Sequence, residues 1–312
     1  MTRTSGPAAA EAMNDERKAA LARRRRTTFS RWAADTGWRH LVTVAILVFA
    51  LVPIVYVVSA AFNPNGTLSA TSLLPDAFSL SSFERLFTDG NIPFARWFAN
   101  SMVIAIPAAF ISIFVSSLAA YAFSRFRFTG RRPMLLFLLL IQMFPSFLAV
   151  VALYLIFGAI GDHYPVAGLN TKLGLMLVYM GGALGVSTWL MKGFFDTIPK
   201  ELDEAATIDG AGHAQIFFGM ILPLAAPIIA ISGILAFVGT MNDYILASLF
   251  LTDRGEMTLA VGLRTLVADN APASYFGVFA AGALLTSVLT VTVFLSLQRY
   301  IVSGLTGGAV KG

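Results

Sequence analysis

The chain has 312 residues, of which 57% are hydrophobic and only 12% are charged, and its mean hydropathy is +0.74. Because soluble domains carry about 25% charged residues, this composition predicts a protein with several membrane spans. The absence of cysteine excludes disulfides and a thiolate nucleophile, and the three histidines (His40, His163 and His213) are too scattered to favour a zinc cluster. The net charge of +5 does not indicate nucleic acid, since the basic residues flank apolar runs.

Residues 1–40 form a basic tail rich in Ala, Arg and small polar residues, which we expect to be mostly disordered. The apolar run 41–62 follows it. A cleaved signal peptide is the alternative interpretation, because Val58, Ser59 and Ala60 resemble a cleavage site. The run is longer than the roughly 7–15 apolar residues of a signal peptide, so an uncleaved first span is favoured.

Six apolar stretches are long enough to cross a bilayer as helices, which requires about 20 residues each. After the first span they are 97–123, 134–160, 173–191, 224–251 and 276–297. β-Barrel strands would instead show short alternating segments. We therefore predict an all-α fold with one six-helix membrane domain over 41–303 and a short tail at 304–312.

The Lys and Arg residues are distributed unequally between the two sides of this topology. Seventeen lie on the side of the termini, including nine before residue 41 and four between Arg125 and Arg132. The other side has only five, which are Arg85, Arg96, Lys172, Arg254 and Arg264. The positive-inside rule therefore predicts that both termini are cytoplasmic, and we interpret Arg125 to Arg132 as topogenic charges that contact lipid headgroups.

The predicted spans are nearly free of charge. They contain one ionisable side chain, Asp243, beside Asn242 and Tyr244. Ion-coupled transporters generally need more intramembrane charge than this. The chain also lacks a GxxxxGK[ST] phosphate loop and a convergent set of acid, base or nucleophile. We therefore expect an uncharged solute pathway, an external energy source, and no catalytic or metal-binding residues.

Several polar and aromatic residues are candidates for that pathway. Asn242 and Asp243 could form a polar wall or gate, or could equally cap a helix irregularity. Gln142, close to Pro145, could bind solute hydroxyls or join two helices. Aromatic side chains could stack on a solute but more often pack or anchor membrane helices; they are Tyr154, Tyr179, Trp189 and Tyr244.

A polar island interrupts the apolar sequence within the loop 192–223. Pro199 suits the start of a helix, and the acids that follow complement the positive end of its dipole. Lys200 and Glu204 can pair one turn apart, and Gly210 and Gly212 provide a stop. A second helix through 216–218 should follow. The pattern predicts a helix, a turn and a second helix that could dock on a soluble partner at the cytoplasmic face.

The residues of this island resemble a known motif. Glu204-Ala205-Ala206, then Gly210 and then Leu222-Pro223 are similar to the EAA motif in permease subunits of bacterial ABC importers that depend on a solute-binding protein. Met220 departs mildly from the aliphatic β-branched residue common there. The similarity extends over about 41–312 and is strongest to the maltose/maltodextrin-type members, in the segments 121–128, 142–145, 168–171 and 304–312, where Ala309 is a small departure.

The resemblance implies a MetI-like permease fold in the inner membrane, and a non-enzymatic subunit that forms a sugar pore with a second, homologous permease. It also implies a homodimeric cytoplasmic ATPase that binds ATP and Mg, and an extracellular sugar-binding protein; lipid surrounds the pore, and no cofactor of its own is expected. Alternatives are an ABC permease for trehalose or another sugar, and a secondary sugar transporter.

The resemblance further assigns roles to three groups of residues. The ATPase-coupling residues would be Glu204, Ala205, Ala206, Asp209 and Gly210. The tail that reaches the ATPase would include Gly307, Gly308, Val310 and Lys311. The contact with the binding protein would be made by Asp253, Arg254, Gly255 and Glu256.

Overall fold

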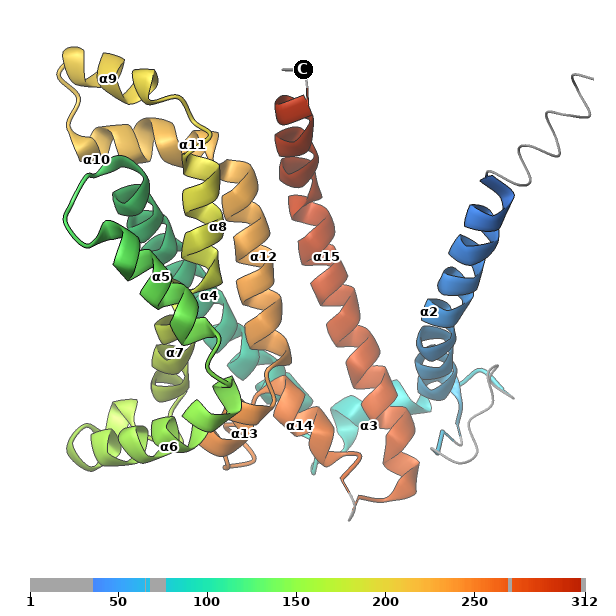
Figure 1. Cartoon of the computed structure of the whole chain (residues 1–312). Helices are drawn as coiled ribbons and strands as arrows, with labels where there is room; N and C mark the ends of the chain where they lie inside the picture. The colour runs from blue at the N-terminus through green and yellow to red at the C-terminus, as the bar shows by residue number, and fades with distance from the viewer. Residues whose placement is uncertain (1–35, 65, 68–76, 269–270, 310–312) are drawn as a thin grey trace, which may run out of the picture.

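The computed structural model describes residues 36–64, 66–67, 77–268 and 271–309, and every regular element in these ranges is helical (Figure 1). The predicted all-α fold is confirmed. The expected basic tail lies outside the described residues as far as residue 35, and helix α2 begins at Trp38.

Three of the six predicted spans are single helices. They are α2 (Trp38–Phe62), α4 (Phe94–Arg125) and α15 (Phe276–Ala309), and each contains an apolar stretch long enough to cross a bilayer. Pro53 and Pro107 lie inside α2 and α4 without ending them. Since α15 continues to Ala309, the tail expected from residue 304 is helical up to that point.

The predicted fourth span is bent. It consists of α7 (Lys172–Gly181), a short 3₁₀ turn η3 (Gly182–Leu184) and α8 (Val186–Phe195), and α7 and α8 meet at an angle of 49°. The prediction of one continuous helix was wrong here, because three glycines fall at the break and glycine weakens a helix interior.

The predicted fifth span is interrupted at both ends. Its membrane helix is α12 (Ala226–Asn242), which is bent by 78° from the preceding segment His213–Leu224. Pro223 and Pro227 flank the bend, and neither can donate a backbone hydrogen bond. At the other end Asp243 has an extended backbone and α13 (Ile245–Phe250) begins after it. The expected continuous helix over 224–251 was therefore wrong.

The predicted third span is two separate helices. α5 (Arg131–Gln142) ends before Pro145, and α6 (Ser146–His163) starts after it and lies across the lower end of the bundle in Figure 1. Pro145 lacks an N–H and disfavours helical backbone at Phe144, so the helix stops there. Of this region only the apolar part of α6, Leu148–His163, forms a long hydrophobic helix, and it is short for a span.

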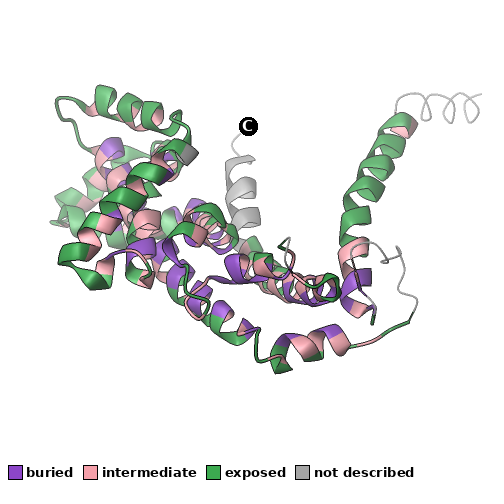
Figure 2. Ribbon diagram, turned by 90° about the horizontal axis from the view of Figure 1, so that it is seen from below, coloured by how far each residue is buried: buried purple, intermediate pink, exposed green. Residues whose placement is uncertain are grey.

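Helix α4 is central to the bundle and contacts α12, α8 and α7. One buried cluster surrounds its start, with Trp97 and Phe94 against Met241 and Leu259. A second surrounds its end, where Tyr121 meets residues of α8 and of the polar loop. In Figure 2 the buried residues lie mostly through the middle of the molecule. Burial at both ends of α4 fixes it relative to the loops on each side.

The first and last spans form a pair at one side of the bundle (Figure 1). α2 packs on α15 and on the short helix α3 (Ser81–Thr88). Small residues make this contact, and Ala60, Ala61, Ala280 and Ala281 are 0% exposed. Small side chains let membrane helices approach closely, which explains the pairing.

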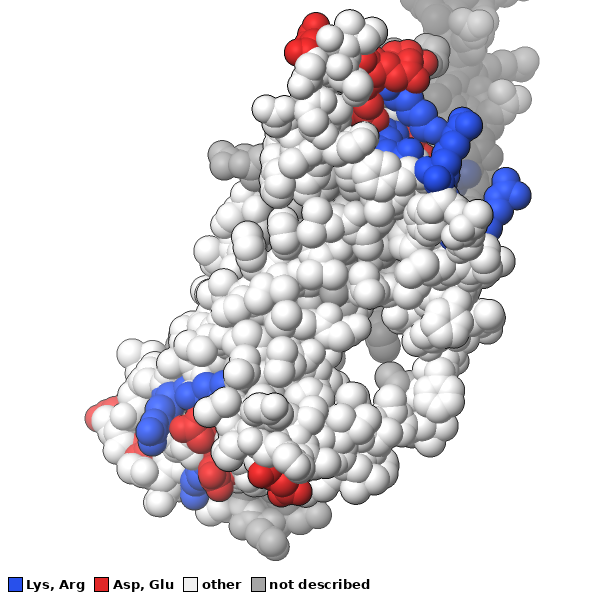
Figure 3. Space-filling model, turned by 90° about the vertical axis from the view of Figure 1, so that its left-hand side faces the viewer, with Lys and Arg blue, Asp and Glu red and all other residues white. Residues whose placement is uncertain are grey.

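On one face of the molecule the charged side chains lie at the two ends (Figure 3). Figure 3 shows Lys, Arg, Asp and Glu gathered at the top and the bottom of one face, with none in the broad band between them. Large apolar side chains are exposed along the long helices, such as Phe49 on α2 and Phe110 on α4. We refer to the two ends as the α9 end, named for α9 (Lys200–Ile208) in the polar island, and the α14 end, named for α14 (Leu259–Thr265).

Candidate functional site

The polar island folds as the sequence predicted. Helix α9 (Lys200–Ile208) follows Pro199, whose φ of −55° suits the N-cap position, and acids occupy its first turn. Gly210 ends it with a φ of +86°, the left-handed conformation that favours glycine. The Ala211 N–H then donates to the Ala206 carbonyl at 2.9 Å. The helix therefore stops where the two glycines indicated.

The second helix of the island also forms. The Gly212 N–H donates to Gln215 Oε1 at 2.8 Å, which fixes the start of α10 (His213–Ile216). A π-helical turn (Phe217–Ile221) and α11 (Leu222–Leu224) continue it. The π turn was not predicted, and it places Phe217 and Ile221 in the buried cluster at the end of α4.

Helix α9 has an inner and an outer face. Asp203 and Ala206 are partly buried, and Ala206 packs on the cluster at the end of α4. The exposed residues are Lys200, Glu201, Leu202, Glu204, Ala205, Thr207 and Ile208, together with Asp209 directly after the helix. Ile208 is 87% exposed, although an isoleucine usually packs inside a protein. We call these exposed residues the outer face of α9, although Glu204 and Ile208 also line the cavity described below. The surface combines charged residues, a small residue and a solvent-exposed apolar side chain, which suits contact with another protein.

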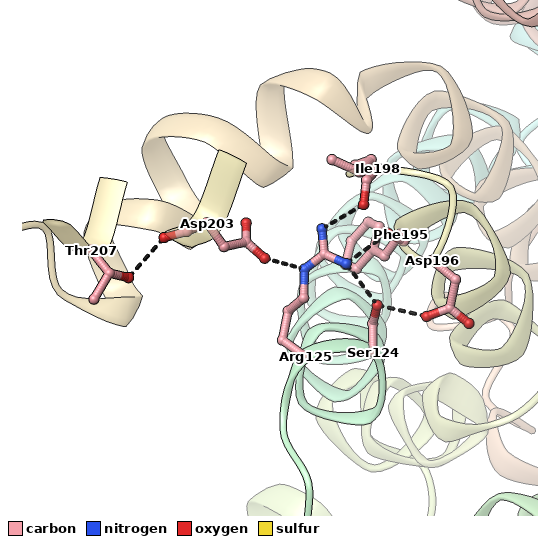
Figure 4. Close-up of polar contacts among 7 residues, drawn as sticks. All are labelled: Ser124, Arg125, Phe195, Asp196, Ile198, Asp203 and Thr207. Atoms are coloured by element: carbon pink, nitrogen blue, oxygen red, sulfur yellow. Dashed lines mark hydrogen bonds and ion pairs between the residues drawn. The ribbon is translucent and has the colours of Figure 1, made fainter. Parts of the chain in front are cut away.

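Arg125 holds the inner face of α9 (Figure 4). Its Nε lies 2.5 Å from Asp203 Oδ2, and the guanidinium side chain is only 5% exposed. Its other two nitrogens donate to the carbonyl oxygens of Phe195 and Ile198, each at 3.1 Å. One side chain at the end of α4 therefore joins the end of α8, the connecting loop and α9.

A second polar contact supports this one. The Ser124 hydroxyl donates to Asp196 Oδ1 at 2.7 Å, and Lys192 Nζ lies 2.5 Å from Asp196 Oδ2. Burial alone would raise the pKa of Asp196, but the bonds from Lys192 and Ser124 outweigh it and hold the pKa below its usual value. The carboxylate therefore stays ionised and tied to α4 near neutral pH.

Two interpretations of this region were wrong. Arg125 does not contact lipid headgroups, because its side chain is buried against α9. Lys200 and Glu204 do not form an ion pair; the acid of α9 that is paired among the described residues is Asp203. The signal for this pair in the sequence is weak, since Arg125 is the first cation after a long apolar run and its partner lies 78 positions further on.

A cavity lies between α9 and the rest of this end. It has a volume of about 340 Å³ and is lined by residues of both sides, among them Phe126, Ile208 and His213. Because of this space, α9 is attached mainly through the Arg125–Asp203 pair and the packing of Ala206. Its position therefore depends on few contacts.

The pathway candidates do not form one cluster. Asp243 Oδ1 accepts a hydrogen bond from the Ala247 N–H at 3.1 Å and so caps α13. The Asp243 carboxylate also lies close to the buried Tyr179 hydroxyl, which has no partner with hydrogen-bonding geometry among the described residues. Asn242 donates to the Val238 carbonyl at 3.0 Å and lines a different space, about 370 Å³ in volume, between α12, α14 and α15. Tyr244 is 46% exposed.

Gln142 is placed elsewhere, at the end of α5. A Cβ on Gly185 would collide with the Gln142 amide, so the amide packs directly against the break between α7 and α8. This contact fits a helix-joining role, and it also explains why glycine occupies position 185.

The loop between α13 and α14 is held to α4 by hydrogen bonds. Trp97 Nε1 donates to the Arg254 carbonyl at 2.8 Å. Asn100 Nδ2 donates to the carbonyls of Gly255 and Met257 at 2.9 and 3.0 Å. The Leu259 N–H donates to Ser101 Oγ at 2.7 Å. Three side chains near the start of α4 thus fix the backbone of this loop and of the first residue of α14.

The same loop has two further attachments. Lys172 Nζ lies 2.9 Å from Glu256 Oε2, and Asn170 Oδ1 accepts bonds from the N–H and hydroxyl of Thr252. Asp253 is exposed, and its carbonyl accepts the Glu256 N–H in a turn. The roles of Trp97 and Asn100 were missed, although an amide in an apolar run is a signal of a buried polar contact.

The C-terminal candidates are only partly placed. Gly307 and Gly308 lie in the last turn of α15, and Val310 and Lys311 lie outside the described residues.

An apolar helical bundle with a polar docking loop at one end is the architecture of a membrane transport subunit, and the comparisons agree. Residues 112–307 match the family described as binding-protein-dependent transport system inner membrane component. The chain belongs to this family, whose members are permease subunits of ABC transporters.

Individual relatives match most of the chain. The galactooligosaccharides transport system permease protein GanQ of Bacillus subtilis (strain 168) is 39% identical over 88% of this chain and 94% of its own length. The maltodextrin permease MdxG of the same strain is 36% identical, and the maltose/maltodextrin permease MalG of Vibrio vulnificus (strain YJ016) is 38% identical, each over 88% of this chain and 95% of the relative.

The fold also matches a solved structure. A chain from the crystal structure of a bacterial ABC transporter involved in the import of the acidic polysaccharide alginate superposes with a TM-score of 0.73. It is 23% identical in sequence, and the match covers 86% of this chain and 98% of the other. The match supports the ABC-importer permease fold.

Proposed function

We propose that this chain is one of two permeases through which an ABC importer carries a neutral oligosaccharide, with maltose or maltodextrin as the first candidate. The observation that carries the proposal is α9, a short helix with an exposed acidic and small-residue face, on a chain 36–39% identical to sugar permeases. A second permease would complete the pathway.

The orientation follows from charge. The α9 end carries the cations that follow α4 and those of the polar loop, and the positive-inside rule places such an end in the cytoplasm. Both termini would then be cytoplasmic. The outer face of α9 would lie in a groove of a dimeric ATPase, which would bind ATP and Mg.

The α14 end would face the solute-binding protein. Its loop at Asp253, Arg254, Gly255 and Glu256 is exposed in part but has a fixed backbone. A surface that is already ordered loses little conformational entropy on binding, so this loop is suited to a transient partner.

The energy for transport would come from the ATPase. Moving a two-state equilibrium from 1:99 to 99:1 requires about 5.5 kcal/mol of differential binding. α9 would therefore need to stay docked in both states, since loose docking would separate ATP hydrolysis from movement. A secondary transporter is the alternative; the single charged residue in the predicted spans, Asp243, does not favour it.

A neutral substrate agrees with the distribution of charged side chains. A polyanion would be expected to pass cationic groups, and on the visible face of Figure 3 these are confined to the ends. Galactooligosaccharide is a second candidate, since the relative that carries it is as similar as the maltodextrin permeases. Trehalose is a further possibility within the same class.

The test is uptake by the transporter reconstituted in vesicles with its neighbouring permease, ATPase and binding protein. Labelled maltotriose, galactotriose and trehalose would be compared, with ATP and with a proton gradient as energy sources. ATP-dependent uptake of maltotriose is expected. It should be lost in Gly210→Leu and Glu204→Lys, and retained in the exposed control Thr197→Ser. Uptake by the chain alone in a proton gradient would refute the proposal.

A further inference from the structure

Helix α4 connects the two loops at opposite ends of the molecule. It has 32 residues, which at 1.5 Å per residue corresponds to about 48 Å. Its last residue, Arg125, binds α9 and the loop before it. Near its first turn, Trp97, Asn100 and Ser101 bind the backbone of the loop before α14.

The contacts at both ends are buried and specific. Asn100 is 4% exposed and Ser101 is 3% exposed, and Trp97 is 0% exposed. At the other end the Arg125 side chain is 5% exposed. Buried hydrogen bonds of this kind are costly to break, because each leaves an unsatisfied polar group. A displacement of either loop would therefore be resisted by α4.

The other helical routes between these loops are interrupted. The α7–α8 route bends by 49° at three glycines. The route from the polar loop through α12 bends by 78° and is broken again at Asp243. Pro107 removes one backbone bond within α4, but the helix continues through it and the neighbouring Ala105 and Ala108 are buried. Among the described helices, α4 is the continuous one with side-chain bonds to both loops.

We propose that α4 is the element that transmits movement between α9 and the loop at Asp253–Met257, and that Asn100 and Arg125 are the positioning residues at its ends. The proposal rests on the proposed function, in which these loops contact the binding protein and the ATPase. It differs from that function because it assigns the connection to one helix and to two side chains.

The first experiment measures how much the sugar-loaded binding protein stimulates ATP hydrolysis by the assembled transporter. Asn100→Asp removes both donors to the loop with little change of shape, and Arg125→Met removes the bonds to α9. Each should reduce the stimulation ratio about tenfold, whereas the exposed controls Asn91→Asp and Arg127→Met should not change it. If Asn100→Asp fails to assemble, Ser101→Ala removes a single acceptor and should give a smaller loss.

The double variant decides whether the two residues act in series. Independent sites this far apart would multiply their losses, giving about a hundredfold reduction. Two ends of one connection would give no more than the larger single loss, because one break already disconnects the loops. Multiplied losses would overturn the proposal.

A second readout needs no partner. The chain has no native cysteine, so spin labels at Ala205→Cys and Asp253→Cys, both at exposed positions, report the distance between the two loops. A narrow distribution is expected, and it should broaden in Asn100→Asp and Arg125→Met but not in the controls. The variants could broaden the distance distribution while the sugar-loaded binding protein fails to stimulate ATP hydrolysis by the wild-type transporter. That result would refute the proposed function and leave the α4 connection supported. An unchanged distribution in both variants would overturn the connection.

Discussion

Replacing Arg125 with methionine tests the structural basis of the coupling site most directly. Methionine replaces the apolar stem of the arginine side chain but removes the guanidinium group and its charge. Asp203, whose side chain is 17% exposed, would be left as an unpaired carboxylate, and the carbonyls of Phe195 and Ile198 would lose their donors. Helix α9 should therefore detach more readily from the bundle.

The size of the effect follows from burial. Removing one partner of a buried ion pair costs about 3–5 kcal/mol. Because water still reaches part of Asp203, we expect the lower end, about 3 kcal/mol, which is about a hundredfold in the equilibrium between attached and detached α9. Adding Asp203→Leu should recover about half of this loss, since the unpaired charge is removed while both carbonyls stay without donors.

Hydrogen exchange of the α9 amides measures this equilibrium. In Arg125→Met the protection of residues 200–208 should fall about a hundredfold, whereas α4 and α12 should be unaffected. Arg127→Met is the matched control, because Arg127 is exposed two residues further along the chain. Equal protection of α9 in Arg125→Met and Arg127→Met would show that the pair does not hold the helix.

Substitutions at three other positions have defined outcomes. Gly210→Val should destabilise the end of α9 by about 1–2 kcal/mol and Gly210→Asn by less, since Asn tolerates a positive φ and a Cβ there meets no neighbour; thermal unfolding would show the order. Ile208→Asp should leave thermal stability unchanged, because the side chain is 87% exposed, but should weaken co-purification with the ATPase about 30-fold or more. Wild type should be more stable than Asp196→Asn at neutral pH. Because the folded pKa of Asp196 lies below its usual value, this difference should disappear only as the pH falls through the lowered pKa, and a pH series of unfolding curves checks it.

The sequence was most informative where local chemistry decides the structure. The helix and turn of the island depend on Pro199 and Gly210, whose backbone preferences are intrinsic, so both ends of α9 could be predicted. Apolar length likewise identified α2, α4 and α15, because a helix that crosses a bilayer needs a long apolar run. Length alone did not show the breaks at Pro145 and Asp243, because hydropathy averages over residues that differ in backbone behaviour.

The contacts between distant segments could not be predicted from composition. Arg125 and Asp203 are separated by 78 positions, and Asn100 meets carbonyls more than 150 positions away. A backbone carbonyl has no signature in the sequence, so a buried donor shows only that some partner exists. For this reason the expected contact of Arg125 with lipid headgroups was wrong, although its position after a long apolar run favoured that interpretation.

The distribution of breaks has a physical explanation that links fold and transport. A backbone group left unpaired in hydrocarbon costs several kcal/mol, so an interrupted helix persists only where protein or a wet cavity satisfies it. At one interruption the Asp243 carboxylate accepts the Ala247 N–H at the start of α13, and at the other the Gln142 amide packs against Gly185. α4 lies against the broken helices α7, α8 and α12 and is itself continuous. The interrupted helices α7, α8 and α12 can bend at their breaks, whereas α4 keeps its length. Movement at one end of the molecule must therefore either bend the interrupted helices or displace α4 as a unit.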